Sequence, residues 1–134
     1  MKIAVDTNIL FSFFWKNSFT KKLLINSLFE LVSPELAIEE LKKYSKEIMK
    51  KAKISKKDFD KLLKDLGLYV KIINKKEYSS FIPNCESFSP DKDDLEFFAL
   101  CKKFSCSLWS NDFILKRQNE IKVLTTKEII ELLY

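Results

Sequence analysis

Lys2-Ile3-Ala4-Val5-Asp6 is a short apolar run that ends on an acid, near the start of the chain. The run predicts a buried first strand, with Asp6 just beyond its carboxyl end. Ser107-Leu108-Trp109 predicts another short strand, which ends in Ser110-Asn111-Asp112. In open parallel sheets, sites form outside the carboxyl ends of strands, where the strand order reverses. Asp6 and Asp112 are therefore candidates for a site, although an Asp that follows a strand often serves only as a helix cap.

Short apolar segments alternate with segments of helical spacing along the chain. The predicted strands are residues 2–5, 31–32, 69–73, 107–109 and 122–124. The predicted helices are residues 17–29, a helix from Ser33 onward, 55–67, 91–103 (after a loop with Pro83 and Pro90), 113–118 and a last helix from Thr125 or Thr126. This alternation predicts an α/β fold with a parallel sheet, in one domain over residues 1–134.

Two helix starts carry local signals. Ser33 is expected to cap a helix that has Pro34 in its first turn. At the last helix, Glu128 stands three residues after Thr125, which predicts a capping box.

The composition of the 134-residue chain, 46% hydrophobic and 32% charged, is that of a folded protein. No apolar run approaches the roughly 20 residues of a membrane helix, and the N-terminus does not resemble a secretion signal, so we expect a cytoplasmic protein. Cys85, Cys101 and Cys106 form no C-x-x-C pair, which argues against a disulfide framework and a structural zinc site. Because the chain has no histidine, hydrolytic chemistry would need carboxylates, hydroxyls, lysines or an oxygen-bound metal.

The net charge of +5 is unevenly distributed. Residues 42–76 hold 13 lysines and 4 acids, so this basic segment carries +9 and the remainder carries −4. Such a division suits an enzyme that grips a polyanion on one surface and holds cations in another. A solvated, lysine-rich face is the ordinary alternative.

One predicted helix face carries apolar side chains at a 4-3-4 spacing: Ala37, Leu41, Tyr44 and Ile48. At about 100° per residue, Glu40 lies roughly 60° from the centre of this face, at its border. Glu39 lies on nearly the opposite side, among lysines. Glu40 can therefore face the body of the protein, unless it pairs with a surface lysine.

Asp91, Asp93 and Asp94 crowd the start of another predicted helix. The helix dipole favours one or two acids there, but three repel one another unless a cation is near. Periodicity does not choose between Asp93 and Asp94. If these acids meet Asp6, Glu40 and Asp112, hard cations such as Mg²⁺ or Mn²⁺ are the natural counter-ions. Such an ion can orient a water and stabilise charge on a phosphate.

Four motifs in this order resemble the PIN domain, and most of all the single-domain prokaryotic PIN proteins that include VapC-type toxins. The motifs are Val5-Asp6-Thr7-Asn8-Ile9-Leu10, Ser33-Pro34 with Glu39-Glu40-Leu41, Asp91-Lys92-Asp93-Asp94 with Phe97-Phe98-Ala99-Leu100, and Leu108-Trp109-Ser110-Asn111-Asp112. The resemblance implies a Rossmann-like, three-layer fold with an open sheet of about five parallel strands. It also implies a Mg²⁺ or Mn²⁺ site and endonucleolytic cleavage of single-stranded RNA.

The resemblance places the four acids of the family, which hold the metal and act in catalysis, on Asp6, Glu40, Asp94 and Asp112. The choice of Asp94 rests on the D-x-x-D spacing from Asp91. Asp91 and Asp93 would then support or cap the site. Asn8 and Ser110 match positions where the family often carries small polar residues that support it.

The function expected from the resemblance is that of a metal-dependent endoribonuclease, with the toxin of a toxin–antitoxin pair as one form of it. The partners would be RNA, an antitoxin protein and a second copy of the chain. A PIN-like RNA-binding module that no longer cleaves is the alternative, and the presence of all four acids argues against it. A receiver-type domain is disfavoured because Asp6 stands alone after the first strand and Ile73 leads to Asn74 and Lys75.

Overall fold

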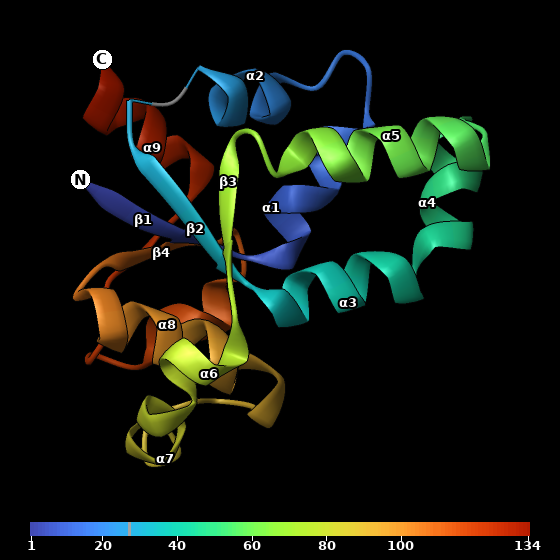
Figure 1. Cartoon of the computed structure of the whole chain (residues 1–134). Coiled ribbons are helices and arrows are strands. Elements are labelled where there is room, and N and C mark those ends of the chain that lie inside the picture. The colour runs from blue at the N-terminus through green and yellow to red at the C-terminus, as the bar shows by residue number, and fades with distance from the viewer. Residues whose placement is uncertain (27) are drawn as a thin grey trace.

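Five parallel strands form one sheet in this computed structural model, which describes residues 1–26 and 28–134 (Figure 1). The strand order is β3-β2-β1-β4-β5, so the order reverses between β1 and β4. The strands are β1 (Lys2–Val5), β2 (Glu30–Pro34), β3 (Val70–Ile73), β4 (Ser107–Trp109) and β5 (Val123–Leu124). The predicted α/β fold with an open parallel sheet of five strands is confirmed.

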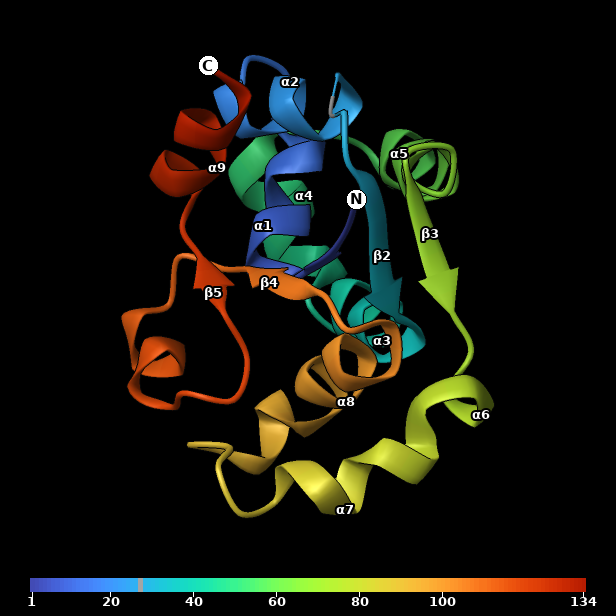
Figure 2. The ribbon, with the colours of Figure 1, turned by 90° about the vertical axis from the view of Figure 1, so that its left-hand side faces the viewer.

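Helices flank the sheet, and β4 lies between α1 and α8 in Figure 2. The α-helices are α1 (Thr7–Phe11), α2 (Phe19–Ile25), α3 (Glu35–Lys43), α4 (Ser45–Ala52), α5 (Lys56–Leu66), α6 (Lys75–Tyr78), α7 (Ile82–Cys85), α8 (Leu95–Phe104) and α9 (Thr126–Leu133). Short 3₁₀ helices are η1 (Ser12–Phe14), η2 (Ser79–Phe81), η3 (Lys92–Asp94) and η4 (Phe113–Arg117). Within the described ranges, no helix has the length and apolarity needed to cross a lipid bilayer.

The middle of the sheet explains why the first strand is apolar throughout. Ile3, Ala4 and Val5 are fully buried, as expected for a central parallel strand covered on both faces. Val5 pairs with Trp109, so β1 and β4 end at the same level. The backbone N–H of Asp6 then donates to the carbonyl of Trp109 at 3.0 Å. This register brings the residues that follow the two strands side by side.

The predicted cap at Ser33 is wrong, because β2 continues through this residue. Ser33 is fully buried, and its Oγ donates to the carbonyl of Val5 at 2.8 Å. Pro34 pairs in register with Ile73, and α3 begins only at Glu35. Pairing with β1 and β3 therefore overrides the local helix signal of Ser-Pro.

Several predicted boundaries also differ from the structure. The helix predicted over 17–29 is only α2, and Ser27 of that range lies outside the described residues. The helix α1, directly after Asp6, was not predicted. The predicted loop before residue 91 contains α6, η2 and α7, and the helix predicted over 113–118 is the 3₁₀ helix η4. The predicted capping box of Thr125 and Glu128 is confirmed.

Candidate active site

Asp6 follows β1 and lies at the start of α1. Its carboxylate makes no capping hydrogen bond to that helix and instead accepts a hydrogen bond from Ser110 Oγ at 2.7 Å. Burial raises the pKa of Asp6 above its ordinary value of 3.8, against the effect of the Ser110 hydrogen bond, and the charge of Asp112 raises the pKa further. Asp6 is thus held in place by a residue that is 104 positions away in the sequence.

Asp112 reaches the same region from the end of β4. Ser110 is fully buried, and its Oγ accepts the backbone N–H of Asp112 at 3.1 Å. One carboxylate oxygen of Asp112 accepts the N–H of Ile114 at 3.0 Å, so Asp112 does cap η4, as the simpler interpretation predicted. Ser110 therefore links both strand-end acids, because it donates to one and positions the backbone of the other.

Glu40 is tied to the same end of the sheet through Thr7. The buried Thr7 hydroxyl donates to Glu40 Oε1 at 2.7 Å, which joins α1 to α3. Burial raises the pKa of Glu40, the Thr7 hydrogen bond opposes this, and the charges of Asp6 and Asp93 raise the pKa further. No ion pair among the described residues involves Glu40, and Glu39 is exposed on the other side of α3. The predicted difference between the two glutamates is what the structure shows.

The three crowded acids take up different positions. Asp91 is exposed and caps η3 by accepting the N–H of Asp93 at 3.3 Å. Asp93 is exposed and Asp94 is half-buried. Burial raises the pKa of Asp94 from 3.8 to about 6, and the charges of Asp6, Asp91 and Asp112 add to this effect. The charges of the two strand-end acids therefore act on Asp94, and the charge of Asp93 acts on both Asp94 and Glu40.

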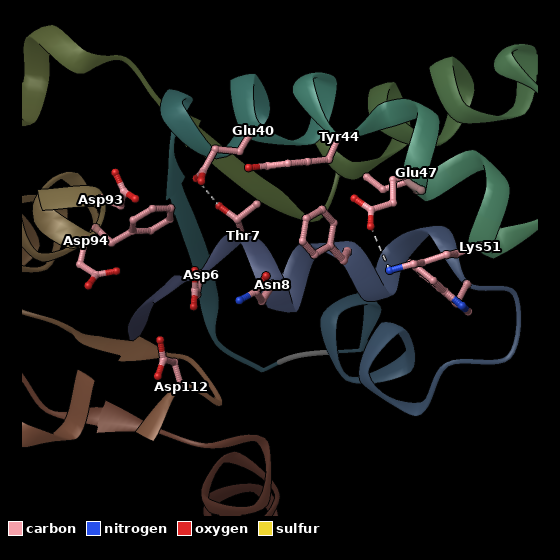
Figure 3. A pocket seen from close by; sticks show the side chains of 14 residues that line it. Asp6, Thr7, Asn8, Glu40, Tyr44, Glu47, Lys51, Asp93, Asp94 and Asp112 are labelled. Carbon is pink, nitrogen blue, oxygen red and sulfur yellow. Dashed lines mark hydrogen bonds and ion pairs between the residues drawn. The ribbon is translucent and has the colours of Figure 1, made fainter. Parts of the chain in front are cut away.

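A pocket of about 410 Å³ brings the four predicted acids together. Ser110 and Asp91 lie outside its lining, whereas Asn8 and Asp93 belong to it. In Figure 3, Asp6, Asp93, Asp94 and Asp112 lie toward one end, and Glu47 and Lys51 toward the other. The lining residues are Asp6, Thr7, Asn8, Phe11, Trp15, Glu40, Tyr44, Glu47, Ile48, Lys51, Asp93, Asp94, Phe97 and Asp112.

The charges of this pocket are not balanced. Lys51 is the one basic side chain in the lining, and its Nζ pairs with Glu47 at 3.1 Å rather than with the four acids. An uncompensated group of carboxylates offers the oxygen ligands that Mg²⁺ and Mn²⁺ prefer. Across residues 1–26 and 28–134, no three acidic, cysteine or histidine side chains are close enough to hold one ion together. The set fits an ion that takes one or two carboxylates and keeps several waters, as Mg²⁺ typically does.

Sequence reasoning missed the aromatic part of the pocket and three polar residues, Thr7, Glu47 and Lys51. The signal for the aromatic residues was present, because Asn8, Phe11 and Trp15 recur at three- and four-residue spacing. It was not used because α1 was not predicted.

These observations define an α/β protein with an acidic pocket at the reversal point of a five-stranded parallel sheet. Residues 4–131 match the PIN domain family, so the chain belongs to this family, whose members are generally nucleases. The family resemblance seen in the sequence is confirmed.

One solved structure with a similar fold is the crystal structure of VapBC2 from Rickettsia felis bound to a DNA fragment from their promoter. A chain of that structure superposes with a TM-score of 0.65 and 18% sequence identity, over 93% of this chain and 98% of that chain. At this identity the likeness concerns the fold. None of the curated proteins compared with the chain matches it.

Proposed function

We propose that this chain is a Mg²⁺- or Mn²⁺-dependent endoribonuclease, with Asp6, Glu40, Asp94 and Asp112 as its metal-binding and catalytic acids. The observation that supports this most directly is the pocket, whose lining takes acids from four distant segments and whose base, Lys51, pairs with Glu47 instead. Family membership supports the nuclease class. The absence of histidine excludes the commonest metal-free general base.

Each acid has a distinct setting for this role. Ser110 orients Asp6 and Asp112 together, Thr7 orients Glu40, and the cap formed by Asp91 fixes the turn that carries Asp94. Asn8 and Asp93 complete the polar lining and support the site. A bound divalent ion would activate water and offset negative charge on the phosphate in the transition state. The raised pKa values of Asp6, Glu40 and Asp94 reflect the repulsion and burial that such an ion relieves.

Single-stranded RNA is the proposed substrate, and the basic segment, residues 42–76, supports a polyanion. This segment forms α4, α5 and neighbouring parts of α3, β3 and α6, and α4 contributes Lys51 to the pocket. Exposed lysines raise the rate of encounter with a phosphate backbone and hold it without reading its sequence.

We further propose that the protein acts in the cytoplasm as the toxin of a toxin–antitoxin pair. The similarity of its fold to a chain of the VapBC2 structure supports this role. A small antitoxin reading frame should then adjoin the gene. Its product should co-purify with this chain and inhibit cleavage, and a homodimer is the expected state of the toxin itself.

The decisive experiment is cleavage of single-stranded RNA with Mg²⁺ or Mn²⁺. We expect Asp6→Asn, Asp112→Asn and Glu40→Gln each to lower the rate at least about 100-fold, because each removes charge that acts in the transition state. Glu39→Gln, on the exposed side of the same helix, is the matched control and should cleave like the wild type. Equal activity in all variants would refute the proposal.

A PIN-like module that binds RNA without cleaving it is the second candidate. It draws support from the observation that no three of the described acidic side chains already share an ion site. Metal-independent RNA binding without turnover, in the same assay, would favour this candidate over the nuclease.

A further inference from the structure

The pocket extends beyond its acids between two rows of side chains that face each other. One row, on α1 and the residues after it, has Asn8, Phe11 and Trp15. The other, on α3 and α4, has Glu40, Tyr44, Glu47 and Lys51. Figure 3 shows Tyr44 between Glu40 and Glu47, above Asn8, with Lys51 at the far end. The pocket is therefore acidic at one end, has Tyr44 in the middle and ends at the ion pair of Glu47 and Lys51.

The polar ends of the pocket aromatics have no partners, unlike those of the core aromatics. In the core, Trp109 Nε1 donates to Thr126 Oγ1 at 3.0 Å and the Tyr78 hydroxyl donates to Glu96 at 2.6 Å. Among the described residues, neither the indole N–H of Trp15 nor the hydroxyl of Tyr44 has a hydrogen-bond partner. Both side chains are partly exposed, Tyr44 by 41%. Because both groups reach the surface at the pocket, a ligand bound there can accept hydrogen bonds from them.

The aromatic rings of this site are not paired with other described rings. The ring pairs of the described residues join Phe13, Phe14, Phe59, Tyr69, Phe88 and Phe98. Phe11 and Trp15 take part in none of them, and the contact recorded for the Tyr44 ring is with Lys43 Nζ, 5.5 Å from its centroid. Phe11 and Trp15 pack against the core as partly buried side chains, so a part of each remains accessible at the pocket.

A nucleotide has the properties that this region can bind: a flat aromatic base, a polar base edge and an attached, negatively charged phosphate. We propose that Trp15 and Tyr44 form a nucleobase subsite beside the acids, where one base of a single-stranded RNA stacks next to the phosphate to be cleaved. The Asn8 amide meets the edge of the base, and the Trp15 and Tyr44 polar groups meet its ribose or phosphate. Lys51 leaves its exposed pair with Glu47, which costs little, and contacts a neighbouring phosphate. The proposal rests on the proposed function only for the position of the phosphate at the acids.

Tryptophan fluorescence tests the subsite without relying on catalysis, because the chain has two tryptophans and only Trp15 is accessible. The probe is a short single-stranded RNA, titrated with Ca²⁺ in place of Mg²⁺ and checked afterwards for intactness. An abasic oligonucleotide of the same length and charge is the comparison. We expect the RNA to quench the fluorescence and to bind at least about fivefold more tightly than the abasic strand, since base–aromatic stacking contributes that much per base.

Variants separate stacking from a structural role. Trp15→Ala and Tyr44→Ala should each raise the Kd for RNA at least about fivefold, to the level of the abasic strand. Trp15→Phe keeps a stacking face and should bind nearly as the wild type while losing the quenching signal. Tyr134→Ala, at a side chain that is 92% exposed and outside the pocket, should change nothing.

The outcomes are distinct from those of the nuclease assay. The subsite would be overturned if folded Trp15→Ala and Tyr44→Ala bind RNA like the wild type. It would also be overturned if the abasic strand binds as tightly as the RNA. A protein side chain would then be the alternative occupant. Base-dependent quenching without metal-dependent cleavage would uphold the subsite and refute the nuclease. Metal-dependent cleavage whose KM is unaffected by Trp15→Ala would support the nuclease and refute the subsite.

Discussion

Asp94 shows most clearly the electrostatic cost of placing several acids in one pocket. Its folded pKa, about 6, is above the ordinary 3.8, so the folded state binds a proton more tightly than the unfolded chain does. The stabilisation from this proton is therefore complete below about pH 4 and is lost as the pH rises through about 6. At neutral pH the metal-free protein carries a charge that its surroundings oppose.

Asp94→Asn is accordingly expected to stabilise the metal-free protein at pH 7.5. Because Asp94 is half-exposed and screened by solvent, the expected gain is only about 1 kcal/mol, or about 3 to 5 °C in Tm. The gain should vanish at pH 3.5, where the wild-type carboxyl is also neutral. Thermal melts with and without Mn²⁺ check this, and the variant should lose most of the upward shift in Tm that the ion gives the wild type. A variant that melts like the wild type and like Glu39→Gln at pH 7.5 would show that Asp94 is fully solvated.

At the residue scale, the sequence predicted best where one helix face decided the outcome. Glu40 and Glu39 were distinguished by their angle from the apolar face, and the structure exposes Glu39 and places Glu40 in the pocket lining. Periodicity did not distinguish Asp93 from Asp94, and the choice of Asp94 came from the family resemblance; both line the pocket, and Asp94 is the more buried. The contact between Ser110 and Asp6 joins residues 104 positions apart, which no local pattern contains.

Helices and strands were predicted where local chemistry outweighed tertiary pairing. Ser55 accepts the N–H of Asp58 at the start of α5, and Gly67 follows its end with a φ of −63°, which does not require glycine. The face of Ala37 to Ile48 is split at Tyr44 into α3 and α4. This break keeps the apolar side chains of both helices on the core while Tyr44 remains at the pocket, an outcome that periodicity alone does not predict.

The capping box of α9 provides a test at this scale. Thr125 accepts the N–H of Glu128 at 3.2 Å, and the Glu128 carboxylate accepts the N–H of Thr125 at 3.2 Å. Thr125→Ala should lower the free energy of unfolding by about 1 kcal/mol, because it leaves a helix N–H without its partner. RNA cleavage should be unchanged at a temperature where the variant is folded, since α9 contributes nothing to the pocket lining. Urea unfolding followed by circular dichroism measures the loss, and Lys127→Ala, an exposed neighbour, is the control.

The arrangement of the whole molecule depends on the strand order of the sheet, which no local sequence pattern specifies. The alternation of segments predicted a parallel sheet, and the acids at strand ends predicted a site, but only the order β3-β2-β1-β4-β5 makes the ends of β1 and β4 neighbours. This strand order was not predicted from the sequence. The helix α4 follows α3 along the chain and contributes Lys51 to the lining, so the basic segment reaches the pocket through α4.

The salt dependence of RNA binding tests whether lysines of the basic segment, residues 42–76, contact phosphates of the RNA. For single strands, the logarithm of the binding constant falls with the logarithm of salt concentration, by about 0.7 for each phosphate neutralised. If Lys51 exchanges Glu47 for a phosphate, Lys51→Ala should flatten the slope by about 0.7, whereas Lys127→Ala on α9 should leave it unchanged. Fluorescence titrations at about 50 to 300 mM KCl measure this slope, because added salt progressively screens exposed charges over this range. An unaltered slope in Lys51→Ala would mean that the pair with Glu47 survives in the complex, and that the phosphate backbone leaves the pocket by another path.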